Sequence, residues 1–223
     1  MKILYAGNGI FGLMGLVKIL SYEQFSIDDI YILNESNDIS NSSELIRNYA
    51  ETYGLTIHED PLKEKLKFDL LISVHWRKYL SMDLIKSARI GGINLHPSLL
   101  PKYAGCSSLA WALLNSEKKV GYTWHLLGQK FDSGDIVFQK EINVKKNDNA
   151  FSLWNRVNSL GVNEIKLCID KLSNKNTKLL KQDLSKRTYY PRGFPSYNEI
   201  KKRRPSITFE NYKRASYFPN KSS

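Results

Sequence analysis

The chain has 223 residues, of which 42% are hydrophobic and 25% are charged, a balance typical of a globular domain. Thirty-three Lys and Arg residues against 22 Asp and Glu give a net charge of +11, but aromatic residues make up 12% of the chain. This composition excludes disordered and collagen-like chains. Two cysteines, Cys106 and Cys168, are too few for a disulfide framework or a structural zinc site.

Short apolar runs alternate with segments of helical periodicity along the first 172 residues. Such alternation predicts an α/β fold with a mostly parallel, doubly wound sheet. The second helix is expected to be capped by Asn41 or Ser42. We expect strands at 2–6, 27–33, 56–58, 68–74, 93–96, 120–126 and 136–144. One helix is expected directly after the glycine turn at 7–9, and further helices at 42–53, 107–114 and 149–172.

The composition changes in a polar, lysine-rich stretch near 174–182. Residues 181–223 contain 11 Lys or Arg and three Asp or Glu, a net charge of +8, with eight aromatic residues between them. We therefore predict a domain at 1–180 and a C-terminal extension at 181–223. The apolar start, residues 1–20, is interrupted by Asn8 and Lys18. It is expected to belong to the fold of a cytoplasmic protein without a membrane span.

A glycine turn, Gly7, Gly9 and Gly12, separates the first strand from the first helix. Backbone N–H groups at such a helix start can bind an anion, as in dinucleotide-binding folds. The acid expected about 20 residues further on is ambiguous between Asp28 and Asp29. A tight turn with close helix packing explains the glycines equally well.

A second candidate site begins on the strand at 93–96. Asn94 and His96 are two residues apart, so their side chains point to the same face of the strand. Prolines at 97 and 101 end the strand, at the sheet edge where ligands bind in open α/β folds. An acid from the loop at Asp132 would orient the imidazole, and the set could stabilise an oxyanion and transfer a proton. The alternative is a structural histidine at a strand end. The other histidines, at 58, 75 and 125, are expected to be surface or satisfied residues and not metal ligands.

The run Asn-Leu-His-Pro-Ser-Leu-Leu-Pro at 94–101, with Asp-Ser-Gly-Asp at 132–135, resembles the signature of formyltransferases that use 10-formyltetrahydrofolate. The resemblance covers about residues 1–170 and implies a Rossmann-like sheet in which Asn94, His96 and Asp132 are catalytic. It implies that an amine attacks the formyl carbon, that Asn94 and protonated His96 stabilise the oxyanion, and that Asp132 supports proton transfer without a metal.

The resemblance also implies a folate pocket and its lining. One departure is Ala104, where many members of the family have an arginine, which puts any contact of that arginine in doubt. The positions that match the family's folate contacts are Trp76, Arg77, Leu80, Ser98, Leu99, Leu100, Pro101, Gln129, Lys130 and Phe131.

The basic, aromatic tail resembles the extension of bacterial sugar N-formyltransferases of the O-antigen type, which act on nucleotide-linked amino sugars. Aromatic rings suit a nucleobase and cationic side chains suit a diphosphate. The resemblance implies a homodimer, and dTDP-4-amino-4,6-dideoxyglucose is the preferred acceptor. Candidate acceptor contacts are Asn8, Gly9, Lys186, Arg187, Tyr189, Tyr190, Arg192 and Arg214.

Three other functions remain open. The methionyl-tRNA branch resembles two-domain proteins with a β-barrel that 43 residues are not expected to supply. Phosphoribosylglycinamide formylation fits the length and the glycine turn but leaves the tail unexplained. A non-enzymatic nucleic-acid-binding module would explain the charge, although the basic run at 201–204 suits a solvated loop better.

Overall fold

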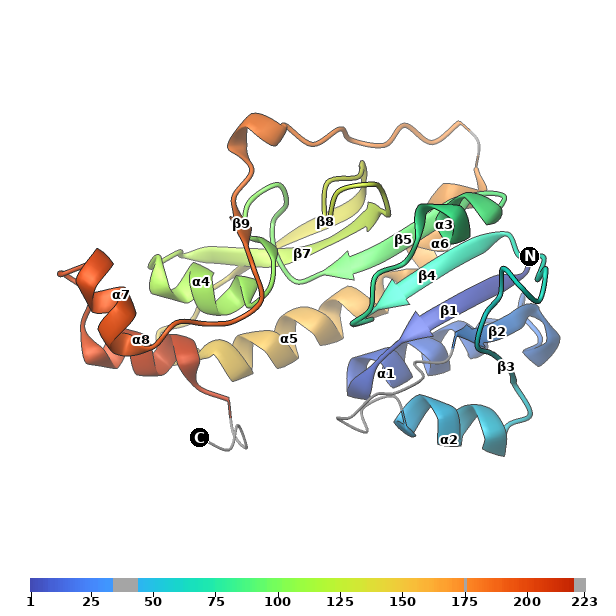
Figure 1. Cartoon of the computed structure of the whole chain (residues 1–223), viewed down its shortest axis with the longest axis horizontal. Coiled ribbons are helices and arrows are strands. Elements are labelled where there is room, and N and C mark those ends of the chain that lie inside the picture. The colour runs from blue at the N-terminus through green and yellow to red at the C-terminus, as the bar shows by residue number, and fades with distance from the viewer. Residues whose placement is uncertain (34–43, 175, 219–223) are drawn as a thin grey trace.

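A seven-stranded sheet forms the centre of the protein (Figure 1). The computed structural model describes residues 1–33, 44–174 and 176–218. The strand order is β3-β2-β1-β4-β5-β7-β8, and a separate two-stranded sheet pairs β6 with β9. The strands are β1 (Ile3–Gly7), β2 (Ile30–Leu33), β3 (Thr56–His58), β4 (Leu70–Val74), β5 (Gly91–His96), β6 (Ala104–Gly105), β7 (Lys119–Leu126), β8 (Ile136–Asn143) and β9 (Tyr189–Tyr190).

Helices flank this sheet on both faces. Strands β1 to β5 run parallel, whereas β7 is antiparallel to both β5 and β8. The predicted mostly parallel α/β sheet is therefore confirmed. The helices are α1 (Gly9–Leu20), α2 (Glu44–Thr52), α3 (Met82–Ser87), α4 (Ser108–Leu114), α5 (Ala150–Asn163), α6 (Ile165–Ser173), α7 (Tyr197–Arg203) and α8 (Phe209–Ser216).

The alternation of side chains along β1 divides the core into two clusters. Ile3 and Tyr5 belong to the larger cluster, which includes apolar residues of α1, α5 and α6. Leu4 and Ala6 belong to a smaller cluster on the other face, with Leu84 of the short helix α3. Because β1 and β4 are buried along their whole length, their near-continuous apolar sequences are those expected of central parallel strands.

Two predicted elements differ from the structure. The strand expected at 27–33 begins only at Ile30, because Ser26 and Asp29 form a capping box that folds Ile27–Asp29 into a 3-10 turn. The helix expected at 149–172 breaks at Glu164, whose N–H bonds the Gly161 carbonyl and so interrupts the α-helical ladder. Helix α3 was not expected. The caps proposed at 41 and 42 lie outside the described residues.

The glycine turn shows close packing. Gly9 has a φ of 61°, and a Cβ on Gly12 would lie 2.9 Å from the Gly7 carbonyl carbon. The Tyr5 hydroxyl donates a hydrogen bond to the Gly12 carbonyl. A side chain at either position would strain the turn or collide with β1, so a tight turn accounts for these glycines.

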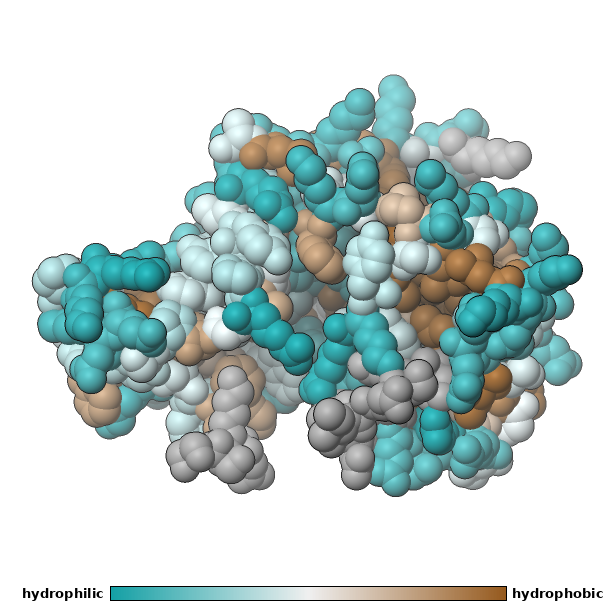
Figure 2. Space-filling view, viewed as in Figure 1, coloured by the Kyte–Doolittle hydropathy of each residue, from teal (hydrophilic) through white to brown (hydrophobic). Residues whose placement is uncertain are grey.

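The described part of the C-terminal segment, 181–218, packs along the main body, and its buried apolar residues belong to the larger core cluster. After α6 the chain runs back past the edge strand β8, pairs β9 with β6, and continues into α7 and α8, of which α8 packs beside α4 and α5 (Figure 1). Ile200, Ile207 and Ala215 are buried in the larger core cluster. The surface over α7 is mostly hydrophilic (Figure 2), in keeping with its lysine and arginine residues. The predicted boundary at residue 180 stays a prediction.

Within 1–33, 44–174 and 176–218, no helix has both the length and the apolar character needed to cross a membrane.

Candidate active site

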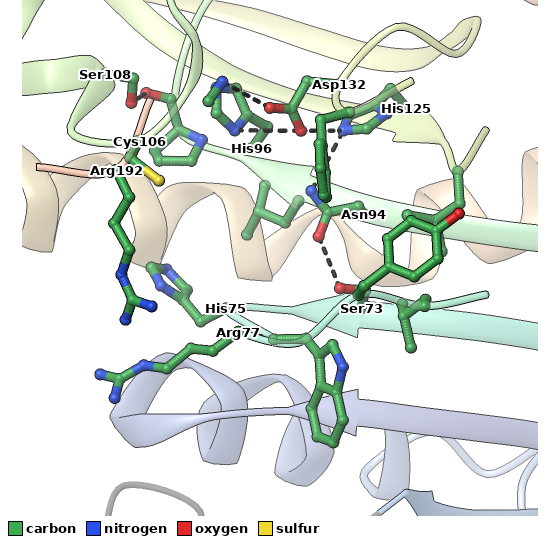
Figure 3. A pocket seen from close by; sticks show the side chains of 18 of the residues that line it. Ser73, His75, Arg77, Asn94, His96, Cys106, Ser108, His125, Asp132 and Arg192 are labelled. Carbon is green, nitrogen blue, oxygen red and sulfur yellow. Dashed lines mark hydrogen bonds and ion pairs between the residues drawn. The ribbon is translucent and has the colours of Figure 1, made fainter. Parts of the chain in front are cut away.

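A cavity of about 730 Å³ opens at the carboxyl ends of β4 and β5. Its polar lining includes Asn94 and His96 from β5, His125 from β7, and Asp132 from the loop between β7 and β8 (Figure 3). This is the sheet edge at which open α/β folds bind ligands. The structure thus brings Asn94, His96 and Asp132 together in one concave site.

The Asn94 amide is held by two partners, and their hydrogen bonds fix its orientation. The Ser73 hydroxyl on β4 donates to Asn94 Oδ1 at 2.8 Å, and Asn94 Nδ2 lies 3.3 Å from His125 Nε2. His125 donates through Nδ1 to the Leu126 carbonyl at 2.8 Å, so its Nε2 can accept one Asn94 N–H. The second Asn94 N–H remains to donate into the cavity.

His96 is only 5% exposed and has a different partner on each ring nitrogen. Its Nε2–H donates to the Tyr103 carbonyl at 2.8 Å. Its Nδ1 lies 3.7 Å from Asp132 Oδ1, a separation that suits an ion pair but exceeds a hydrogen bond. The ring is therefore anchored at one nitrogen, and the other nitrogen faces the carboxylate.

Asp132 occupies a left-handed backbone conformation with a φ of 52°. Its Oδ2 accepts the Gly105 N–H at 2.8 Å, and its Oδ1 lies 3.4 Å from His125 Nε2. Burial alone would raise the pKa of this carboxyl, but its interactions with the neighbouring His96 and His125 rings, with the bond from Gly105, hold the pKa well below its usual range. Asp132 is therefore a carboxylate at neutral pH.

Gly105 is required where β6 meets β9. Its φ is 88°, and a Cβ there would lie 2.1 Å from the Tyr190 carbonyl oxygen. The absence of a side chain lets the backbone N–H reach Asp132 while β9 passes alongside. The C-terminal segment and the catalytic loop thus meet at this glycine.

Sequence reasoning missed Ser73 and His125. His125 was expected to be a satisfied or surface residue, and it is indeed buried and hydrogen-bonded, yet it also joins Asn94 to Asp132. Asn94 and His125 are directly opposed in the antiparallel β5–β7 pair, which puts both side chains on one face. The alternation of His125 with apolar residues was visible in the sequence. The sequence did not show that β5 pairs with β7, and without that pairing His125 could not be placed beside Asn94.

His75 also lines the cavity, just after β4 (Figure 3). Its φ is 58°, its Nε2–H donates to Asn158 Oδ1 at 2.7 Å, and its ring stacks on Phe11 at 5.6 Å. Burial lowers the pKa of its imidazole. His75 is therefore a neutral hydrogen-bonded wall of the cavity and not a charged group.

The positions matched to folate contacts fall into two sets. Trp76, Arg77, Leu80, Gln129, Lys130 and Phe131 line the cavity. The segment 98–101 does not, since Ser98 Oγ donates to the Lys102 carbonyl, Leu100 N–H donates to Thr123 Oγ1, and Ser98 and Leu99 line a second cavity of about 230 Å³. Pro101 follows in the same turn and accepts the Thr188 N–H through its carbonyl.

An aromatic wall suits a flat heterocycle. Trp76 Nε1–H is buried and has no hydrogen-bond partner among the described residues, so it can donate to a bound ligand. Tyr79 and Phe131 form an edge-to-face pair at 6.0 Å and are 61% and 59% exposed. These residues fit the pterin and aryl rings of a folate.

The acceptor candidates also divide. Tyr189 and Arg192 line the cavity, and Arg187 lies over the Tyr189 ring while donating to the Phe131 carbonyl at 2.9 Å. The others have structural surroundings outside the cavity lining: Asn8 and Gly9 in the first turn, Lys186 paired with Asp183, Tyr190 stacked on Trp111, and Arg214 bonded to the Lys145 and Asp148 carbonyls. Their proposed contacts stay predictions.

A preorganised amide N–H and an imidazole beside a buried carboxylate define an acyl-transfer site on an α/β sheet. In the part of the chain that the structure describes, no three His, Cys, Asp or Glu side chains are arranged so that they could hold a metal ion. The formyl transferase family model matches residues 56–169, and the chain belongs to this family.

Three relatives show the range of this likeness. The chain is 33% identical to GDP-perosamine N-formyltransferase of Brucella melitensis biotype 1 over 77% of its own length and 63% of the relative, so it spans less than two thirds of that protein. It is 45% identical to the bifunctional polymyxin resistance protein ArnA of Wigglesworthia glossinidia brevipalpis over 42% of its length and 14% of the relative. The N-formyltransferase structure from Helicobacter canadensis with folinic acid and dTDP-3-aminofucose is 24% identical, with a TM-score of 0.79 over 98% of this chain and 81% of that one. This likeness shows the shared fold.

Proposed function

We propose that the protein is a sugar N-formyltransferase that moves a formyl group from 10-formyltetrahydrofolate to the amine of a nucleotide-linked amino sugar. The observation that carries the proposal is the convergence of Asn94, His96 and Asp132 at a cavity with aromatic and cationic walls. The names of the Brucella and Helicobacter relatives support the same reaction and both substrate classes.

The catalytic residues divide the work by position. The free Asn94 N–H donates to the formyl oxygen, where negative charge develops as the amine adds. Asp132 stabilises the charged form of His96, and its carboxylate and His96 Nδ1 are the groups that take up the proton of the attacking amine. That proton passes to the folate nitrogen as the bond between this nitrogen and the formyl carbon breaks, so tetrahydrofolate leaves and the formyl group stays on the amine. Ser73 and His125 keep the Asn94 amide from rotating, so the donor is in place before the reaction.

The aromatic wall holds the formyl donor. When bound, 10-formyltetrahydrofolate supplies an activated formyl group on nitrogen. Trp76 donates to the heterocycle through Nε1, while Tyr79 and Phe131 pack against its rings.

The cationic residues hold the acceptor's diphosphate. Figure 3 shows the guanidinium groups of Arg77 and Arg192 on the same side of the cavity as His75. Arginine presents a planar pair of donors that matches phosphate oxygens. Arg77 thereby joins the acceptor side, although the family resemblance assigned it to folate. The specific acceptor that we propose is dTDP-4-amino-4,6-dideoxyglucose.

Formyl transfer, followed as tetrahydrofolate release, tests the function against a panel of acceptors. The panel holds dTDP-4-amino-4,6-dideoxyglucose, GDP-perosamine, dTDP-3-aminofucose and glycinamide ribonucleotide. Turnover on one nucleotide sugar supports the proposal and identifies the acceptor. Turnover on glycinamide ribonucleotide alone, or nucleic-acid binding without turnover, contradicts it.

Replacing Arg192 with alanine is expected to raise the KM for the nucleotide sugar by about 10- to 100-fold, since a hydrogen bond to a charged group contributes about 1.5–3 kcal/mol. The KM for the formyl donor should stay within about twofold. Steady-state kinetics with each substrate varied in turn makes the measurement. Arg203→Ala, on the exposed face of α7, is the matched control and should leave both constants unchanged. An equal rise in both KM values for Arg192→Ala contradicts the assignment.

The proposal includes a homodimer. A tail too short to form its own core could gain burial by pairing with a second copy. Ile200, Ile207 and Ala215 instead pack within one chain, so any pairing must use other surfaces, such as the exposed Leu180 and Leu184. Light scattering is expected to give twice the mass of the chain, and a stable monomer at micromolar concentration contradicts the dimer.

A further inference from the structure

One side chain of the C-terminal segment contacts the loop that carries Asp132. Gln182 Nε2 donates to the Asp132 carbonyl at 3.0 Å and to the Gly134 carbonyl at 2.7 Å, so both of its N–H groups are used. Two residues earlier, Leu180 pairs with Ile136 at the start of β8, through reciprocal backbone hydrogen bonds. Gln182 is thus held at a fixed distance from the loop by the chain that precedes it.

The loop needs external support. Asp132 has a left-handed φ of 52°, which non-glycine residues keep only where the surroundings fix it. A Cβ on Gly134 would lie 2.0 Å from the Leu126 carbonyl oxygen, so the chain passes very close to β7 at this point. Within the loop, the Ser133 hydroxyl donates to the Lys130 carbonyl. The Gln182 amide, which lies outside the loop, bonds the backbone on both sides of Ser133, at Asp132 and at Gly134. Asp132 is the residue whose carboxylate serves catalysis.

The amide can be oriented in only one way. Gln182 Oε1 is buried and has no hydrogen-bond partner among the described residues. Turning the amide over would direct this oxygen at two carbonyl oxygens, so the two N–H donors fix its orientation. Because an unsatisfied buried acceptor is costly, the side chain is placed here for its donors rather than for its oxygen.

We propose that Gln182 is a positioning residue for catalysis that acts through Asp132. It holds the Asp132 backbone in its left-handed turn and thereby keeps Oδ1 near His96 and Oδ2 on the Gly105 N–H. Arg187 assists from the same segment through its bond to the Phe131 carbonyl. The catalytic effect rests on the proposed formyl transfer, whereas the restraint on the loop does not.

The restraint is tested by hydrogen exchange followed by mass spectrometry on the full chain. Gln182→Met keeps the length of the side chain and removes both donors. We expect exchange to accelerate about tenfold or more in the peptides that contain 132–135 and Gly105, whose N–H is bonded to Asp132. Lys181→Ala, an exposed neighbour, is the matched control and should exchange as the wild type does. Unchanged exchange in Gln182→Met overturns the inference, whatever the enzyme's activity.

Kinetics then separates positioning from a merely structural role. Gln182→Met is expected to lower kcat by about 10- to 100-fold, with both KM values within about twofold, since a displacement near 1 Å can have an effect of this size. Gln182→Glu should lower kcat further, because its carboxylate would face two carbonyl oxygens.

A double variant tests whether Gln182 acts through Asp132. In an Asp132→Asn background, Gln182→Met should lower kcat by less than about a further twofold. Additive losses, or a loss confined to KM, overturn the proposed action through Asp132. If the wild-type enzyme is inactive on every acceptor, the proposed function is contradicted. The hydrogen-exchange measurement would still show whether Gln182 restrains the loop.

Discussion

Replacing His96 with alanine is expected to lower kcat by about 10³-fold while both KM values change little. The imidazole is anchored by its bond to the Tyr103 carbonyl and lies beside Asp132, so it is preorganised for the charge and the proton of the reaction. Because these contacts strengthen only as charge develops, their loss should appear in kcat and not in ground-state binding. Steady-state formyl transfer on the acceptor found with the substrate panel makes the measurement.

A second histidine provides the control for this experiment. His58 at the end of β3 is bonded to Glu64 and lies outside the cavity lining, so His58→Ala should keep wild-type kcat. Since His96 is buried, thermal unfolding of His96→Ala must accompany the kinetics. His96→Gln offers an amide N–H in place of the imidazole and limits any packing loss. If His96→Ala folds normally and keeps a kcat within tenfold of the wild type, His96 is not the proton-transfer residue.

Residues on a single strand were the part of the site that the sequence could predict. Asn94 and His96 follow the period of two along β5, and Pro97 ends the strand at the sheet edge. The continuous apolar run of β4 likewise predicted a buried strand, and the structure buries it along its whole length. In each case the information is local, because the side-chain direction follows from the strand itself.

Features that depend on pairing between distant segments could not be predicted. His125 meets Asn94 only because β7 runs antiparallel to β5 in one particular register, and a shift of one residue would turn it to the other face. Gln182 meets the Asp132 loop after an excursion of about 50 residues. Arg214, chosen for its charge, bonds carbonyls of the turn before α5, and its contact with the acceptor stays a prediction. A guanidinium satisfies backbone acceptors as readily as phosphate, so charge alone did not reveal these partners.

Asp132→Asn is expected to lower kcat by about 10²- to 10⁴-fold, the range found when a group that supports proton transfer is lost. The amide keeps the shape of the side chain, and its Oδ1 can still accept the Gly105 N–H. What disappears is the negative charge beside His96 and His125. The variant should therefore keep both KM values and lose turnover. A variant with near wild-type kcat would show that the carboxylate charge is dispensable.

Asp132→Asn is also expected to change how the free energy of unfolding depends on pH. The folded-state pKa of Asp132 lies below the ordinary value of 3.8, so the charged carboxylate stabilises the fold fully above that value. This stabilisation is lost as the pH falls further, through the folded-state pKa. The free energy of unfolding of the wild type relative to Asp132→Asn should hence decrease as the pH falls below about 4. Urea unfolding of both proteins at each pH makes the comparison, with Asp170→Asn on the exposed face of α6 as the control. A difference that grows as the pH falls below about 4 would mean that burial of the carboxylate, rather than its histidine neighbours, controls its ionisation.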